Sequence, residues 1–273
     1  MALKLRYRSE SSIPVEIEGL TPDWACEKSI AEIERFTVFH GNQKTALAEL
    51  FSISGSASDK RFDFDGNLAG VHWIGAQMNS GEIHVNGSAG RHVGSEMRGG
   101  TIRVDGDVSI WLGAEMHGGL IHVRGNADHL VGSGYRGSVK GMTSGTILID
   151  GNAGDEVGTA MRRGTIAIAG SVGNAVGFQM IAGTIFIFGE CGIRPGAGMR
   201  RGTIGLFGNQ RPRLLPSFVY GTTYQPQFLQ LLLRALNEKG FPTDESLIES
   251  TIDLFHGDLV SIGRGEILLR HQQ

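Results

Sequence analysis

Two arginine pairs, Arg162-Arg163 and Arg200-Arg201, are the residues whose type and spacing most clearly indicate a binding function. Both pairs directly follow a methionine in a repeated motif, and Arg98 follows an earlier methionine in the same way. Guanidinium groups gathered at one corner of a fold bind carboxylates and phosphates. The spacing therefore predicts a contact site for a polyanion or an acidic protein surface, with solvated arginines paired to local carboxylates as the alternative. Three further arginines lie nearby in the sequence: Arg194, Arg211 and Arg213.

The nine histidines do not show the spacing of a metal site. His84 and His122 occupy equivalent positions two repeats apart, with Arg103 between them. At about 4.8 Å between neighbouring strands, their side chains would lie roughly 9–10 Å apart. Zinc holds each of its ligands at about 2.1 Å, so these two histidines cannot share one ion. We expect the histidines to be surface residues and expect no metal ligands on this chain.

Motifs for catalysis and cofactor binding are missing from the sequence. It has no GxxxxGK[ST] phosphate loop, no GxSxG nucleophile elbow and no HExxH motif. The recurring glycine triplets precede no strand–helix unit, which argues against a dinucleotide site. Cys26 and Cys191 form neither a CxxC motif nor a disulfide framework. We expect no catalytic and no cofactor-binding residues on this chain, and a reducing, cytoplasmic location.

Composition excludes several further classes of protein. The formal charge of the 273 residues is −3, whereas nucleic-acid-binding modules usually have a clear basic excess. Only 7 prolines and no three-residue period exclude collagen, and 40% hydrophobic residues argue against disorder. The N-terminus has no apolar signal-peptide core, and no apolar stretch approaches the roughly 18–20 residues of a membrane span. We expect a soluble protein that binds neither nucleic acid nor membranes.

A 19-residue repeat accounts for most of the 42 glycines. Its unit is G-x-x-M-x-x-G-x-I-x-V-x-G, and a weaker copy precedes it at 61–66. One spacing is 26 residues, so seven extra residues at about 133–139 should bulge from a corner without breaking the pattern. That insertion is either a tolerated loop or a binding surface. The strand-like part of each unit begins at Gly81, Gly100, Gly119, Gly145, Gly164, Gly183 and Gly202.

The repeat predicts an all-β core. Each copy alternates apolar and polar residues, as a short strand with one buried face does, and one such strand cannot bury its face alone. Successive copies must therefore stack, which predicts a parallel β-helix of about seven to eight 19-residue coils over 61–209. One expected inward ladder is Ile83, Ile102, Ile121, Ile147, Ile166, Ile185 and Ile204. A second is Val85, Val104, Val123, Ile149, Ile168, Ile187 and Leu206. A third is Met78, Met97, Met116, Met142, Met161, Met180 and Met199.

The two ends of such a stack need caps. Residues 1–60 are predicted to form an N-terminal cap, in which Thr21 and Pro22 begin a helix. Residues 210–273 are predicted to form a C-terminal extension with an apolar, well-buried helix over 227–239. The outward strand positions are polar in the early coils but become apolar in the late ones, with Phe186, Phe188 and Phe207. We expect that aromatic face to be covered, either by the 227–239 helix or by a partner protein.

The glycine-rich repeat resembles that of two families: the C-terminal domain of the large subunit of glutamate synthase, and the C subunit of formylmethanofuran dehydrogenase. The flanks and the length resemble the pattern of the second family over nearly the whole chain. These flanks are Thr21-Pro-Asp23, Lys28-Ser-Ile-Ala-Glu-Ile33, Gly41-Asn42, Leu50-Phe51, Gly257-Asp258 and Gly263-Arg-Gly-Glu-Ile267. The resemblance implies that the β-helix is right-handed.

The family of formylmethanofuran dehydrogenase C subunits has two branches. One belongs to a molybdenum or tungsten enzyme that makes formylmethanofuran from CO2. The other belongs to the formyltransferase/hydrolase complex of methylotrophs, which moves a formyl group from tetrahydromethanopterin to a furan cofactor and hydrolyses it to formate. The chain has 19 arginines against 6 lysines, which favours the second, bacterial branch. The resemblance implies formyltransferase, amidohydrolase-like and further subunits as partners, in a dimer of heterotetramers, with zinc on a partner subunit.

Three hypotheses for this chain follow. It is a non-catalytic scaffold that docks the catalytic subunits, or a binding module whose corner arginines hold the glutamate-rich tail of the furan cofactor. The third is a stand-alone domain similar to that of glutamate synthase, for which the sequence offers no catalytic residues.

Overall fold

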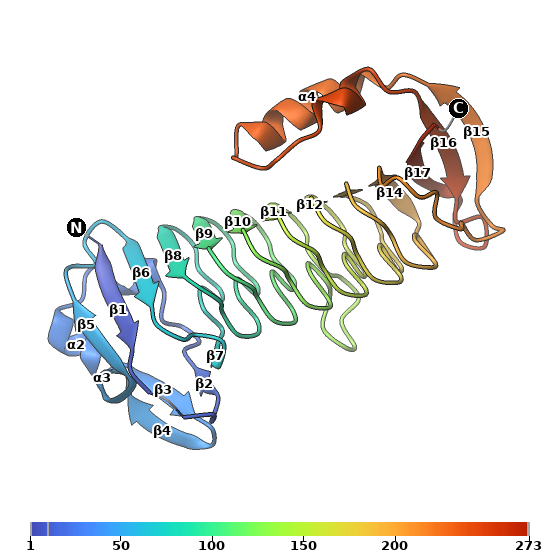
Figure 1. Ribbon diagram of the computed structural model, residues 1–273. Helices are drawn as coiled ribbons and strands as arrows, with labels where there is room; N and C mark the ends of the chain where they lie inside the picture. The colour runs from blue at the N-terminus through green and yellow to red at the C-terminus, as the bar shows by residue number, and fades with distance from the viewer. Residues whose placement is uncertain (1, 10, 272–273) are drawn as a thin grey trace.

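The computed structural model describes residues 2–9 and 11–271. Met1 and Glu10 of the predicted N-terminal cap, and the last two residues of the predicted extension, lie outside the described part. A 13-stranded sheet runs along the whole molecule in the order β15-β16-β17-β14-β13-β12-β11-β10-β9-β8-β6-β1-β5. A four-stranded sheet, β4-β3-β2-β7, lies at the N-terminal end (Figure 1). The predicted all-β core is therefore confirmed.

The strands of the long sheet are short. From the N-terminus they are β1 (Leu3–Tyr7), β5 (Phe51–Ser54), β6 (Arg61–Asp65), β8 (Glu82–Asn86), β9 (Thr101–Val104), β10 (Leu120–Val123), β11 (Thr146–Ile149), β12 (Thr165–Ile168), β13 (Thr184–Ile187), β14 (Arg201–Leu206), β15 (Val219–Tyr224), β16 (Ile252–Gly257) and β17 (Arg264–Arg270). The smaller sheet consists of β2 (Val15–Glu16), β3 (Thr37–His40), β4 (Gln43–Ala46) and β7 (Val71–His72).

The repeat sets the pairing of these strands. Equivalent positions of successive copies face each other in parallel register, as Ile102 faces Ile83 and Ile121 faces Ile102. The register continues across the 26-residue spacing, where Ile121 faces Ile147. A second line of parallel bridges joins the coils on another side, at Leu68, Ala89, Val108, Ala127, Ala153, Val172 and Cys191. Successive turns of the chain therefore stack as coils, which Figure 1 shows side by side.

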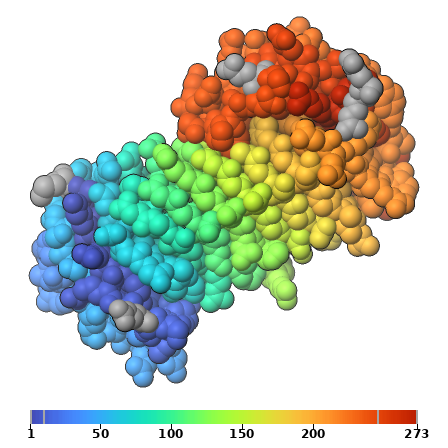
Figure 2. Space-filling view, viewed as in Figure 1, coloured from blue at the N-terminus to red at the C-terminus, as the bar shows by residue number. Residues whose placement is uncertain are grey.

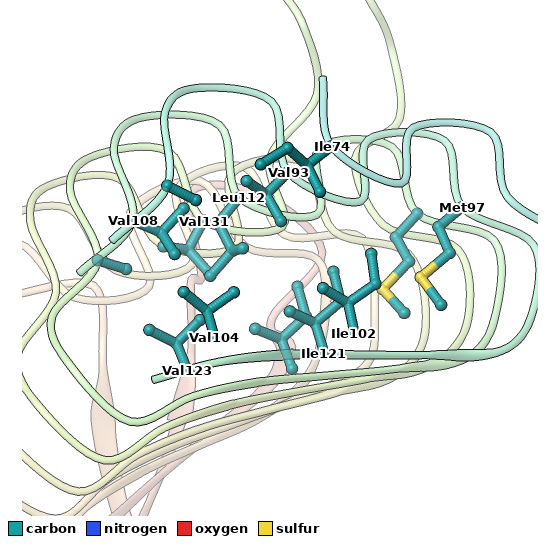
Figure 3. Packing of buried hydrophobic residues seen from close by; sticks show 14 of the residues in the cluster. Ile74, Val93, Met97, Ile102, Val104, Val108, Leu112, Ile121, Val123 and Val131 are labelled. Atoms are coloured by element: carbon teal, nitrogen blue, oxygen red, sulfur yellow. The ribbon is translucent and has the colours of Figure 1, made fainter. Parts of the chain in front are cut away.

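The interior of the stack is apolar from end to end. All three predicted ladders are buried, and every methionine of the third has no exposed surface. Figure 3 shows Ile102 on Ile121 and Val104 on Val123, with Met97 beside them. A further ladder that the sequence analysis missed faces them across the core in Figure 3: Ile74, Val93, Leu112 and Val131. Val157 and Val176, at the equivalent positions of the next two coils, are also buried. Methionine suits this interior because its flexible thioether fills irregular gaps between branched side chains.

Glycine is required where the chain turns next to this core. Gly113, three residues before Met116, has a φ of +59°, which side-chain-bearing residues rarely adopt. A Cβ atom there would lie 2.5 Å from Cδ1 of Ile147 and 3.3 Å from Cδ1 of Ile121. Glycine at this corner therefore permits both the turn and the close approach of the isoleucine ladder.

The N-terminal region closes one end of the stack. Strand β1 pairs in parallel with β6 and antiparallel with β5, so that Leu3, Leu5 and Tyr7 continue the buried face. Three short helices lie beside it: α1 (Pro22–Ala25), α2 (Ile30–Glu34) and α3 (Leu47–Leu50). As predicted, Thr21 is the N-cap of α1 and accepts a hydrogen bond from the backbone of Trp24, with Pro22 at the first helical position.

The C-terminal region closes the other end in a way that the sequence analysis did not anticipate. Strand β17 pairs in parallel with β14 and places Ile267 against Ile204, as another repeat would. Strands β16 and β15 then extend the sheet antiparallel. The last parallel strand thus comes from the segment predicted to be a non-repeat extension.

Helix α4 (Gln227–Asn237) and the 3-10 helix η1 (Glu245–Ile248) lie over the late coils (Figures 1 and 2). The helix ends two residues before the predicted Lys239. The prediction of a well-buried helix is wrong for one of its sides: Leu229, Leu233 and Leu236 face the coils, whereas Leu231 is 70% exposed. One side of the helix therefore meets the stack, and the other faces solvent.

The seven-residue insertion forms a loop between β10 and β11 that protrudes from the stack (Figure 1). Its tip is solvated, since Val139 is 78% exposed. The coils on both sides keep their register, as expected. Among the described helices, none has the length and apolar character needed to cross a bilayer.

Candidate functional site

The arginine pairs lie on one corner of the stack because their backbone joins successive coils. The residues that follow each methionine donate to the carbonyl of the preceding methionine. Arg162 N lies 2.8 Å from Met142 O, and Arg200 N lies 2.7 Å from Met180 O. Ile181 occupies the same position in the coil between the two pairs. At about 4.8 Å per coil, the pairs are roughly 10 Å apart.

The four arginines surround a hollow of about 510 Å³. All four are exposed, and within the described part of the chain none of them forms an ion pair or a side-chain hydrogen bond. The structure therefore does not show the alternative, in which local carboxylates pair with these arginines. The residues that line the hollow are Val139, Lys140, Arg162, Arg163, Ile181, Ala182, Arg200, Arg201 and Ile262. Five positive groups thus face one hollow with no neighbouring carboxylate in its lining.

Not all of the predicted arginines join this site. Arg98 lies in the same corner column, but three coils before Arg162, with His117 and Thr143 in between. Arg211 lies at the C-terminal end, where it pairs with the buried carboxylate of Asp253 at 2.8 Å. The corner site therefore consists of Arg162, Arg163, Arg200 and Arg201, and the structure adds Lys140 from the inserted loop.

A second hollow of about 570 Å³ adjoins the first and shares Val139, Ile181 and Arg200 with it. Its lining reaches Ser261, in the turn between β16 and β17. Two segments that lie far apart in the sequence, the inserted loop and this turn, thus frame one continuous corner surface.

The predicted aromatic face lies elsewhere and is covered by the chain itself. Phe186 has no exposed surface and Phe207 is 3% exposed. They pack with Leu229 and Leu233 of α4. Phe188 is partly buried and packs against the same cluster and against the ring of Phe241. Of the two expected covers, helix or partner protein, the structure shows the chain's own helix.

Two histidines at outward strand positions are each paired with one carboxylate. His84 Nε2 lies 2.8 Å from Asp105, and His122 Nε2 lies 2.8 Å from Asp150. His122 is only 8% exposed and His72 only 6%, so these two are not the surface residues that were expected. Across residues 2–9 and 11–271, no group of three or more His, Cys, Asp or Glu side chains is arranged to hold a metal ion.

An aromatic stack at another corner escaped the sequence analysis. The ring of His92 lies 4.0 Å from that of Trp73 and 5.0 Å from that of Trp111, nearly parallel to both. Burial lowers the pKa of His92 to about 4, and the nearby charges of Arg91 and His72 act in the same direction. The sequence does contain a sign of this stack, because the aromatic rings of Trp73, His92 and Trp111 recur at the 19-residue spacing of the repeat.

The inserted loop is fastened to this stack. The hydroxyl of Tyr135 donates to Ser95 Oγ at 2.9 Å and lies 3.0 Å from Nδ1 of His92. The backbone N–H of Tyr135 donates to Glu115 at 3.0 Å. Burial raises the pKa of Tyr135 to about 12, so its hydroxyl keeps its proton. The base of the loop is therefore ordered against the coils, although its tip is solvated.

Comparison with known proteins decides the family. No family model matches the sequence. A chain in the crystal structure of the formyltransferase/hydrolase complex (FhcABCD) from Methylorubrum extorquens, in complex with methylofuran, is 31% identical. The similarity covers 98% of this chain and 100% of that chain, with a TM-score of 0.88. Among curated proteins, the C subunit of the tungsten-containing formylmethanofuran dehydrogenase 2 of Methanothermobacter thermautotrophicus is 38% identical over 93 residues.

The chain belongs to the family of C subunits of these complexes. The C subunit of the molybdenum-containing formylmethanofuran dehydrogenase 1 of Methanothermobacter marburgensis is also similar, at 41% identity over 91 residues. These curated subunits match over about a third of this chain, and the matched segment spans 34% of the tungsten-type subunit and 23% of the molybdenum-type subunit. The resemblance that the repeat and its flanks indicated is therefore confirmed.

Proposed function

We propose that this chain is a non-catalytic scaffold subunit of a formyltransferase/hydrolase complex. In that role it serves the conversion of formyl-tetrahydromethanopterin to formate through a formylated furan cofactor. The observation that carries the proposal is the similarity, over nearly its whole length, to a chain of a complex of this kind. The catalytic groups belong to the partner subunits in this proposal.

The architecture supports a scaffold. We propose that the stacked coils form a right-handed parallel β-helix over 61–209, between an N-terminal cap (1–60) and a C-terminal extension (210–273). Its core is continuous from Leu3 to Leu269, and protein interiors packed in this way deform little. A rod of this kind holds the subunits that dock along it at fixed separations.

The proposed partners are a formyltransferase subunit, an amidohydrolase-like subunit and a further subunit, assembled as a dimer of heterotetramers in the cytoplasm. The furan cofactor and tetrahydromethanopterin are used by the complex, and zinc is expected on a partner subunit. The methylofuran in the similar complex supports the furan cofactor.

A second candidate is the C subunit of a molybdenum or tungsten formylmethanofuran dehydrogenase. The identity of 38–41% to such subunits favours it. That similarity extends over only a third of the chain, whereas the similarity to the formyltransferase/hydrolase complex extends over nearly all of it. The first candidate is therefore preferred.

One experiment separates the two. The tagged chain is recovered from its native cells, and the proteins and metals that accompany it are identified by mass spectrometry and metal analysis. We expect formyltransferase and amidohydrolase subunits with zinc, and neither molybdenum nor tungsten. Pterin-bound molybdenum or tungsten with iron–sulfur proteins would assign the chain to the dehydrogenase. Recovery of the chain alone would contradict the scaffold role.

A further inference from the structure

The corner that bears the four arginines also bears four exposed apolar side chains, and two of them are the most exposed apolar side chains among the described residues. Val260 is 87% exposed and Val139 78%, while Leu259 and Ile262 are each 53% exposed. Val139 comes from the inserted loop, and the other three come from the turn between β16 and β17. Exposed apolar side chains gathered in one place indicate an interaction surface. Here they adjoin the two hollows that contain the arginines.

The turn that presents three of these residues is firmly held. Asp258 is 5% exposed, and its carboxylate accepts hydrogen bonds from the backbone of Gly198 and of Val260, both at 3.0 Å. The bond to Gly198 ties the turn to the stack, because Gly198 lies in the last coil. The carbonyl of Asp258 accepts two more bonds, from Ser261 and Gly263. Binding therefore loses little conformational entropy at this turn, which favours tight contacts.

We infer that this corner is the docking surface for another subunit of the complex, one that presents carboxylates around an apolar centre. The inference rests on the proposed function and adds to it the place and the chemistry of one contact. The docking surface is defined here as Val139, Lys140, Arg162, Arg163, Ile181, Arg200, Arg201, Leu259, Val260 and Ile262.

Charge and composition both favour a folded protein as the occupant. The hollow has five positive groups and no carboxylate among its described lining residues, so it attracts an acidic surface. Arginine together with apolar side chains is the composition typical of protein–protein contacts. A flexible polyanion, such as a glutamate-rich tail, would pair with the arginines. It would not bury Val260 or Ile262, however, and would leave the apolar half of the surface in water.

The test co-produces the tagged chain with the other subunits of its complex and measures how much of each is recovered with the tag. One variant replaces the arginines (Arg162→Ala, Arg163→Ala, Arg200→Ala and Arg201→Ala). A second variant carries Val260→Asp and Ile262→Asp. Two controls are matched to them: Arg98→Ala, in the same corner column, and Leu231→Asp, an apolar residue 70% exposed on α4 outside both hollows. Thermal melts check that each variant folds.

We expect both variants to lower the recovery of the same subunit by about tenfold or more, as truncation of interface anchors does, while both controls leave it unchanged. In the unsubstituted complex, that contact should also weaken as salt is raised. Recovery of all subunits at unchanged levels by both variants would overturn the inference.

A second outcome would overturn it in favour of the polyanion. In that case the arginine variant keeps every subunit but loses bound furan cofactor, and the Val260→Asp, Ile262→Asp variant has no effect. Failure of the proposed function is distinguishable from both, because the unsubstituted chain itself would then recover no partner subunit.

Discussion

The outer faces of the early and late coils differ although their backbones are the same. One line of paired residues runs across both, and in the early coils it includes His84, Arg103 and His122. The line continues through Leu148, Ala167 and Phe186. Arg103 is exposed, whereas Ala167 and Phe186 have no exposed surface because the C-terminal region covers them.

This difference shows that the inward and the outward strand positions have separate roles. The inward residues are nearly the same in every coil and determine that the coils stack. The outward residues vary without affecting the pairing and determine what lies against each part of the rod. In the late coils that neighbour is the chain's own helix, which leaves the early face and the arginine corner as open surface.

The largest expected effect comes from the covered face. Replacing Phe186 by alanine removes a buried ring that stacks on Phe207 at 5.8 Å. We expect the free energy of unfolding of the C-terminal region to fall by about 3–5 kcal/mol. Limited proteolysis within 210–271 and denaturant titration measure this loss.

The matched control for that variant is Arg103→Ala, at the same line of paired positions in an early coil. Its side chain is exposed, so the free energy of unfolding should change by no more than about 0.5 kcal/mol. Equal losses from the two variants would show that the early face is also covered in solution.

The next effect concerns the carboxylate that holds the C-terminal strands together. Asp253 is 3% exposed and accepts hydrogen bonds from Thr223 at 2.6 Å, Arg211 at 2.8 Å and His271 at 2.8 Å. Burial by itself would raise the pKa of Asp253, but the hydrogen bonds from Thr223, His271 and Arg211 outweigh it and hold that pKa below its ordinary value. We expect Asp253→Asn to cost about 2–3 kcal/mol of unfolding free energy near pH 7.

The pH dependence of that loss has a definite sign. Since the folded pKa of Asp253 lies below the unfolded value, its stabilisation is complete above about pH 4 and is lost as the pH falls through the folded pKa. Denaturant titrations at several pH values measure it. A difference between Asp253→Asn and the unsubstituted chain that stays constant as the pH falls well below 4 would contradict this account.

A smaller effect is expected where the insertion meets the early coils. Tyr135→Phe keeps the ring against the aromatic stack but removes the hydroxyl that donates to Ser95 and lies 3.0 Å from Nδ1 of His92. The unfolding free energy should fall by about 1–2 kcal/mol, since buried polar partners lose their bond. Hydrogen exchange of residues 133–141 should rise more than that of the late coils. Unchanged exchange there would mean that the hydroxyl does not fasten the loop.

The inward pattern could be predicted from the sequence because it recurs. Seven copies of one motif made the strands, their register and the three ladders visible, and the capping of α1 by Thr21 followed from local residue preferences. The aromatic face of the late coils was also predictable, since Phe186 and Phe188 break the polar pattern of the outward positions. Each of these features leaves a signal within one repeat or within one turn of helix.

The features that were missed depend on contacts between distant segments. Strand β17 carries a repeat-like Gly265-Glu-Ile-Leu-Leu269, but it is a single copy set apart from the others by some 55 residues. The corner surface joins the arginines to Val260 and Ile262 only because β17 returns to the last coil and Asp258 ties its turn there. The composition of 227–239 could not show that one face of the helix is exposed, because it does not tell how much of the helix the coils cover.

The smallest expected losses of unfolding free energy concern two histidines on the same line of outward residues. His84 and His122 each lie 2.8 Å from a carboxylate, but the side chain of His84 is 33% exposed and that of His122 only 10%. Residues 238–240, just after α4, line a hollow together with His122, so the C-terminal cover extends as far as this residue. We expect His122→Ala to cost about 1 kcal/mol and His84→Ala no more than about 0.5 kcal/mol, since solvent weakens an exposed pair. Chemical denaturation of both variants tests this order. If the two losses were equal, the cover over the late coils would end before His122, and the boundary between the two faces would have to move towards Leu148.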